Sequence, residues 1–147
     1  MKQFSFSVVL AYLANKDDAG RLTNECITVA TVFVDHYSGY SYVVLMTSPS
    51  EEETLCAEQE FEAHAASLSI RSRIIMLTMV GSMKLFLNDV KLNAQTISFC
   101  GVNAHHQNGI VERHNRTLTD SAWTMLLHAE RMWPEAVSQI LWPFALK

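Results

Sequence analysis

The sequence predicts an α/β domain in which helices flank a mixed sheet. Two strand-like segments lie in the N-terminal third, and a third precedes a long amphipathic segment in the C-terminal half. Strands, then a helix, then another strand and further helices typically form one sheet covered by helices. The chain has 147 residues, of which 49% are hydrophobic and 18% charged. This length and composition suit a single globular domain with a buried core, and they are not typical of disorder.

The first strand-like segment covers residues 26–35, CITVATVFVD, which is rich in β-branched side chains. Such side chains favour a strand. Residues 40–46 form a second segment of the same kind, and the intervening Ser38-Gly39 is typical of a turn. We therefore expect the two segments to pair as an antiparallel hairpin.

A helix is expected to follow. Ser50 is a candidate N-cap, and Glu53 occupies the third position after it, as in a capping box. An apolar stripe at helical spacing comes next, formed by Ala57, Phe61, Ala65 and Leu68. Residues 51–62 also contain six Glu, which we expect on the solvated face of this helix.

The remaining chain contains one short strand and two helices in this prediction. Residues 71–80 are apolar, and their pattern does not decide between strand and helix. Residues 95–100 predict a strand, and residues 101–109 a polar loop. A long helix is expected over residues 110–131, and Pro134 suits the first turn of a last helix.

Composition and charge bound the compartment and the partners. The formal net charge is −4, but residues 63–147 carry eight Lys or Arg against five Asp or Glu. The three cysteines lack the spacing of a zinc site, and their odd number without a disulfide framework favours a reducing compartment. No apolar run is long enough to cross a bilayer. We expect a nuclear or cytoplasmic location, no membrane association and no secretion.

Three short motifs resemble one family. The loop-to-helix segment Gln107–Arg113 reads QNGIVER, residues 31–43 read TVFVDHYSGYSYV, and residues 133–136 read WPEA. Together they resemble the integrase catalytic core of Copia-type LTR retrotransposons, a part of the Pol polyprotein, over roughly residues 20–147. The resemblance implies an RNase H-like fold, DNA partners (retrotransposon ends and target) and assembly into oligomers.

The resemblance also implies a reaction. Integrases of this kind carry out polynucleotidyl transfer with Mg²⁺, and two ions stabilise the attacking and leaving oxygens. Mg²⁺ prefers oxygen ligands, so the family supplies two Asp from neighbouring strands and one Glu from a helix. Glu112 matches that Glu and is the candidate catalytic and metal-binding residue.

The second family carboxylate has no match. It belongs to an Asp-Asn-Gly signature about 35 residues before the Glu. The corresponding stretch here, residues 74–84, reads IIMLTMVGSMK and contains no acid. A one-base shift of a family codon series encoding His-Ala-Asp-Asn-Gly-Arg-Phe can yield residues 76–82, MLTMVGS. We therefore interpret this tract as out of frame and expect it to fit its environment badly.

The first family carboxylate is also missing. It belongs on the strand before residues 26–35, which should fall near residues 4–10, and FSFSVVL there has no acid. We expect a sheet that is incomplete at this strand, a divergent or out-of-frame segment over residues 1–19, and a truncated core-like domain over residues 20–147. Asp35 is interpreted as a near-site residue that caps the turn to Ser38, able to hold an ion only if it lies near Glu112.

The expected DNA-contacting residues are two on the long helix, Arg113 and Arg116, and four in the preceding loop: His105, His106, Gln107 and Asn108. Each arginine could contact phosphate, or Arg116 could pair with Glu112 at i, i+4.

Three interpretations of the whole chain follow: a catalytically dead integrase relic, a non-catalytic DNA- or protein-binding module that kept the fold, and a pseudogene product.

Overall fold

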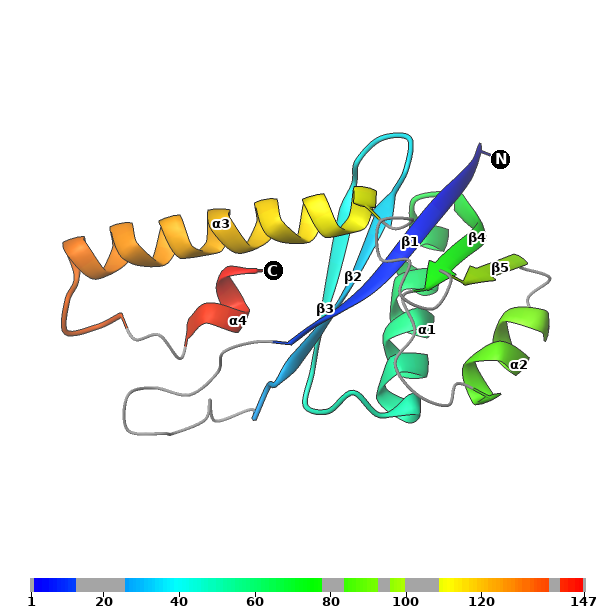
Figure 1. Cartoon of the computed structure of the whole chain (residues 1–147), viewed down its shortest axis with the longest axis horizontal. Coiled ribbons are helices and arrows are strands. Elements are labelled where there is room, and N and C mark those ends of the chain that lie inside the picture. The colour runs from blue at the N-terminus through cyan, green and yellow to red at the C-terminus, as the bar shows by residue number, and fades with distance from the viewer. Residues whose placement is uncertain are drawn as a thin grey trace.

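The computed structural model describes residues 2–12, 26–77, 84–92, 96–99, 109–137 and 141–146. A five-stranded sheet lies between two pairs of helices, so the expected α/β class with a mixed sheet is confirmed (Figure 1). Its elements are, in chain order, β1 (Lys2–Tyr12), β2 (Val29–Asp35), β3 (Ser41–Met46), α1 (Glu51–Ser67), β4 (Ile70–Leu77), α2 (Lys84–Leu92), β5 (Thr96–Phe99), α3 (Gly109–Met132) and α4 (Trp142–Ala145).

The strand order in the sheet is β3-β2-β1-β4-β5. Strands β1, β2 and β3 pair antiparallel, which confirms the predicted hairpin, whereas β4 runs parallel to both β1 and β5. The predicted strand over residues 95–100 is confirmed as β5 in the same sheet. Strand β1 is central, and its Val8 pairs with Leu77 at the end of β4.

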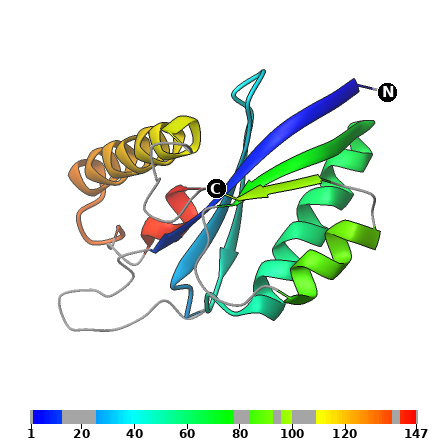
Figure 2. The same ribbon diagram turned by 45° about the vertical axis from the view of Figure 1, so that its right-hand side comes forward.

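Both faces of the sheet are covered, because side chains along a strand alternate between the two faces. On β2, Phe33 belongs to a core cluster with Phe61 of α1, while Val32 and Val34 belong to a second cluster with Val111 of α3. All seven residues of β2 are buried. Figures 1 and 2 show α1 and α2 on one face, and α3 and α4 on the other.

Helix α1 begins as the sequence predicts. The Ser50 side chain accepts a hydrogen bond from the Glu53 backbone N–H (3.2 Å), and Glu53 reaches back to Thr47 N (2.7 Å) and Ser48 N (3.2 Å). The first bond satisfies an N–H group that a helix start leaves without a partner, and the other two satisfy N–H groups of the preceding loop. They also hold the loop between β3 and α1.

The apolar stripe of α1 is confirmed at three of its four positions. Ala57, Phe61 and Ala65 are buried, and the Phe61 ring stacks on Phe33 with 4.3 Å between centroids. Leu68 was wrongly included in the stripe: it is 51% exposed, because α1 ends at Ser67 and Leu68 is its C-cap.

The expectation of an incomplete N-terminal strand is wrong. Strand β1 covers 11 residues and pairs with β2 on one side and β4 on the other, so it holds the two halves of the sheet together. A strand at this position forms hydrogen bonds with a neighbour on each edge. The sheet therefore includes strands from both sides of the predicted domain boundary at residue 19.

Strand β4 occupies part of the tract that we expected to fit badly. Residues 74–77 pair in regular register with β1 and β5. The backbone of these four residues therefore fits the sheet. Residues 78–83 lie outside the described residues, so the rest of that hypothesis stays a prediction.

None of the helices in the described part of the chain has the length and hydrophobicity of a membrane span.

Candidate functional site

Strands β1 and β4 are where the resemblance requires two aspartates. The strands are parallel neighbours, so their carboxyl ends lie at the same edge of the sheet, where α/β proteins commonly place ligand-binding groups. Neither strand contains Asp or Glu. Val8, which pairs with Leu77, is 3% exposed and belongs to the α1-side core. These two strands therefore supply no carboxylate where a metal site needs them.

Glu112 lies in the first turn of α3, as expected, and is exposed. The preceding Val111 is fully buried against Val32 and Val34 of β2 and anchors the start of the helix. Glu112 is thus presented at the positive end of the helix dipole, where a carboxylate is favoured. The same placement would suit a metal ligand or a helix-stabilising acid.

Asp35 ends β2 and is 1% exposed. Its Oδ2 accepts hydrogen bonds from the backbone N–H and the hydroxyl of Ser38, both at 2.7 Å. The Asp35 backbone carbonyl also accepts from Gly39 N at 3.0 Å. The predicted turn-capping role is confirmed.

Asp35 and Glu112 belong to opposite faces of the sheet. Side chains alternate between the two faces along β2, so Asp35 shares the α1 face with Phe33. Asp35 also lines a pocket together with Leu68, at the end of α1. Helix α3, with Glu112, covers the other face. Asp35 therefore does not meet the condition for holding an ion together with Glu112. Within the described ranges, no cluster of three or more His, Cys, Asp or Glu has a metal-binding arrangement.

Arg113 and Arg116 are both exposed on α3. The possible i, i+4 ion pair between Glu112 and Arg116 is absent from this described helix, which leaves both guanidinium groups open to solvent. The four loop residues expected to contact DNA, at positions 105–108, lie outside the described residues.

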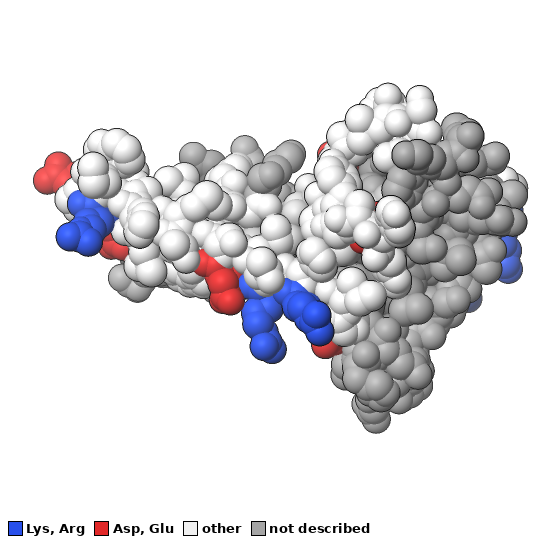
Figure 3. All heavy atoms as spheres, turned by 90° about the horizontal axis from the view of Figure 1, so that it is seen from above, with Lys and Arg blue, Asp and Glu red and all other residues white. Residues whose placement is uncertain are grey.

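Charges of both signs are interspersed along α3. The view in Figure 3 shows basic and acidic groups close together on this face and no continuous basic patch among the described residues. The helix carries as many basic as acidic side chains: Arg113, Arg116 and Arg131 against Glu112, Asp120 and Glu130. The positive charge of α3 is therefore densest near the start of the helix, where two arginines lie close in sequence.

Sequence analysis missed a buried acid. Glu58 of α1 is completely buried, so the prediction that all six Glu lie on a solvated face is wrong for this residue. Burial, together with the charges of Asp89 on α2 and of Glu62, raises the pKa of Glu58 to about 8. Apart from Asp89, neither Glu58 oxygen has a hydrogen-bond partner among the described residues. Its place on the apolar side, one position after Ala57, was the available signal.

No family model matches the chain, and no curated protein matches it. Its structure is similar to that of an integrase chain in the simian T-cell lymphotropic virus intasome in complex with PP2A regulatory subunit B56 gamma. The TM-score is 0.69 with 17% identity, covering 97% of this chain and 46% of that one, so this chain spans about half of the viral protein.

Two further neighbours are structures of the HTLV-2 integrase catalytic core domain in complex with magnesium, described as dimeric and trimeric forms. Each has a TM-score of 0.64 and 16% identity. This chain is covered to 97% in both, and the viral chains to 81% and 78%. The comparison shows that the chain has the RNase H-like fold of retroviral integrase catalytic cores.

Proposed function

We propose that this chain is a relic of the integrase catalytic core of a Copia-type LTR retrotransposon, derived from a Pol polyprotein. In this proposal it keeps the fold and a weak contact with DNA but no longer carries out polynucleotidyl transfer. The fold of viral integrase cores supports the descent, and the motifs at residues 107–113 and 31–43 support the Copia-type origin.

One observation carries the loss of activity: the adjacent parallel strands β1 and β4 contain no acid. In-line phosphoryl transfer by two metal ions needs carboxylates that hold both ions beside the reacting oxygens. Glu112 is the single candidate ligand that the motifs identify, and Asp35 belongs to the other face of the sheet. One carboxylate does not neutralise four positive charges.

The described residues therefore do not fit the Mg²⁺ ions that the family implies. A hard dication prefers several oxygen ligands, and water supplies them at an isolated carboxylate as well as in bulk solution. We expect no more than loose association of Mg²⁺ with Glu112 and derive no reaction step from it.

The retained function in this proposal is DNA binding at the start of α3. Arg113 and Arg116 are exposed and form no ion pair with Glu112, so phosphate can reach both. The helix N-terminus also favours an anion. The loop residues His105, His106, Gln107 and Asn108 would complete this surface. Because acidic groups accompany the arginines on α3, we expect weak affinity.

The experiment is a fluorescence anisotropy titration of a labelled DNA duplex at several salt concentrations. Each phosphate contact contributes a slope of about −0.9 to log K against log salt, so the double variant Arg113→Ala/Arg116→Ala should lose about two units of slope. Arg131→Ala, at the exposed end of the same helix, is the matched control and should change little. Equal losses in both variants, or no DNA binding by the wild-type chain, would contradict the proposed surface.

A protein-binding module is the second candidate, and exposed apolar side chains at the end of α3 favour it. Met125, Leu127, Met132 and Trp133 are each more than half exposed. Large exposed apolar side chains of this kind are common where proteins associate. In this alternative the chain would bind a protein, or assemble into oligomers, without binding DNA in a salt-dependent manner.

The pseudogene alternative predicts that no stable product forms. Two core clusters, one on each face of the sheet, favour a folded domain instead. A single cooperative unfolding transition in urea would support the folded domain. A gradual loss of signal without a transition would support the pseudogene alternative.

A further inference from the structure

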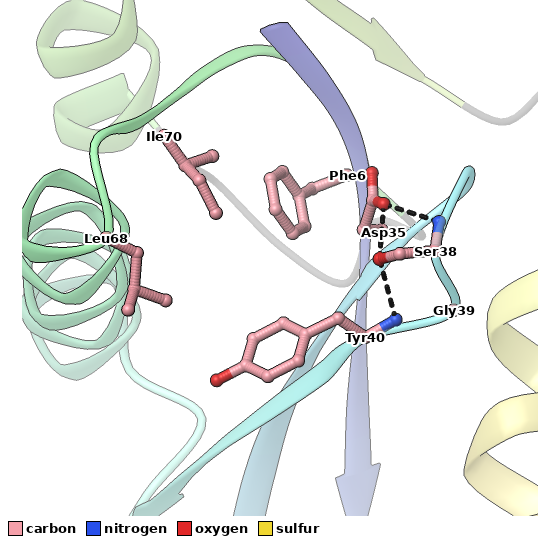
Figure 4. A pocket seen from close by; sticks show the side chains of 7 residues that line it. All are labelled: Phe6, Asp35, Ser38, Gly39, Tyr40, Leu68 and Ile70. Atoms are coloured by element: carbon pink, nitrogen blue, oxygen red, sulfur yellow. Dashed lines mark hydrogen bonds between the residues drawn. The ribbon is translucent and has the colours of Figure 1, made fainter. Parts of the chain in front are cut away.

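A pocket of about 470 Å³ lies on the α1 side of the sheet, between the turn after β2 and the end of α1. Figure 4 shows its lining: Phe6, Asp35, Ser38, Gly39, Tyr40, Leu68 and Ile70. This volume falls within the range of about 300–1,000 Å³ that small-molecule sites occupy. Phe6, Tyr40, Leu68 and Ile70 give it a mostly apolar wall, which suits an aromatic or aliphatic body.

The polar end of the pocket is the carboxylate of Asp35. Its Oδ2 is committed to the turn through Ser38, but its buried Oδ1 has no hydrogen-bond partner in the described part of the structure. A buried oxygen without a donor costs free energy, and the cost is larger for a charged group. A ligand that donates a hydrogen bond to Oδ1 would remove this cost.

The charge of the pocket selects the class of ligand. Among the described residues that line it, Asp35 is the single ionisable group apart from the Tyr40 phenol, and none is Lys, Arg or His. Nucleic acid phosphate is therefore disfavoured by repulsion. A cationic N–H donor would be attracted, because an ion pair in a partly apolar site is stronger than in water.

We propose that this pocket binds a small arylalkyl ammonium compound, with the ammonium group at Asp35 Oδ1 and the ring among Phe6, Leu68 and Ile70. This site goes beyond the proposed DNA-binding function and does not depend on it. Oδ1 is covered in the unliganded structure, so the ligand has to displace a wall side chain. Leu68 is the wall residue best able to move, since it is 51% exposed at the end of α1.

The test is a titration of the full chain with 2-phenylethylamine, followed by NMR chemical shifts. The neutral analogue 2-phenylethanol and the anionic analogue 3-phenylpropionate serve as comparisons. For so small a ligand we expect a dissociation constant of about a millimolar. Shifts should saturate at Phe6, Tyr40, Leu68 and Ile70, with at least about tenfold weaker binding of both analogues.

Two variants separate the carboxylate from the cavity. Asp35→Asn can keep an acceptor for Ser38 while placing an amide donor where Oδ1 was, so it should weaken amine binding about tenfold or more. Leu68→Trp, at an exposed position, fills the cavity with the carboxylate intact and should also abolish binding. Asp120→Asn, on α3 and outside the pocket, is the matched control and should bind as wild type.

Each other outcome overturns the proposal. Equal affinity for the amine and the alcohol would show that the carboxylate does not select the ligand. Full binding by Leu68→Trp would place the ligand elsewhere. Absence of saturable shifts in the wild-type chain would mean that the pocket takes no such compound, and this result would leave the DNA-binding proposal unaffected.

Discussion

The imidazole of His114 lies against Gly39, where the turn between β2 and β3 meets the start of α3. A Cβ placed on Gly39 would be 3.3 Å from His114 Cε1, and Gly39 has a φ of +70°. The glycine therefore serves two purposes: it permits the left-handed turn, and it leaves room for the histidine. The start of α3, with Glu112, therefore lies beside this turn.

Gly39→Ala should destabilise the fold through both effects. The left-handed backbone costs about 1–2 kcal/mol for a residue with a Cβ, and displacement of His114 adds to it. Urea unfolding should show a lower midpoint for Gly39→Ala than for the wild-type chain. The double variant Gly39→Ala/His114→Ala should recover the steric part but not the backbone part. Recovery of the full stability would show that the turn imposes no backbone strain.

The second prediction concerns Asp35. Asp35→Ala removes the acceptor for both Ser38 bonds and should lower the free energy of unfolding by about 1–3 kcal/mol. Asp35→Asn keeps an acceptor for the Ser38 N–H and should cost less. The measurement is again urea unfolding, and equal losses in the two variants would mean that the turn bonds contribute nothing to stability.

The third prediction follows from the raised pKa of Glu58. Its pKa is about 8 in the folded chain, against an ordinary value of 4.5, with burial as the largest cause. Between these values the folded state holds a proton that the unfolded state releases. The free energy of unfolding should therefore fall as the pH rises from about 4.5 to about 8.

Glu58→Gln removes this titration and should stabilise the chain at pH 8, with little change at pH 4. Glu52→Gln, an exposed glutamate on the same helix, is the control and should leave the pH profile unchanged. Thermal unfolding across this pH range makes the comparison. A Glu58→Gln profile parallel to that of the wild-type chain would show that Glu58 is not held protonated.

The strands and helices that carry a clear pattern were predictable from the sequence. The β-branched run of β2 and the capped start of α1 each depend on local chemistry, so Ser50 and the strand were correctly interpreted, although β2 covers Val29–Asp35 and not the first three residues of the predicted range 26–35. Strand β4 was not predictable, because the apolar run within residues 71–80 fits a strand and a buried helix segment equally well. Glu58 was misplaced because all six Glu were assigned to one solvated face, although its position next to Ala57 on the apolar side was a signal for burial.

The candidate site was predictable only in part. Local motifs located Glu112 and the turn-capping role of Asp35. They could not show that the two residues belong to opposite faces of the sheet, because this depends on the alternation along β2 together with the docking of α3. The pocket beside Asp35 has no sequence signal, since Phe6, Tyr40 and Leu68 lie far apart in the sequence.

The central claim is that this fold no longer has a two-metal site. The most direct measurement is an oligonucleotide cleavage and strand-transfer assay with Mg²⁺ or Mn²⁺, with Glu112→Gln as the control. We predict no metal-dependent product from either protein, because β1 and β4 supply no carboxylate and the electrostatic stabilisation that usually dominates the rate is lost. Metal-dependent product from the wild-type chain that disappears in Glu112→Gln would contradict the account and show that a working site forms.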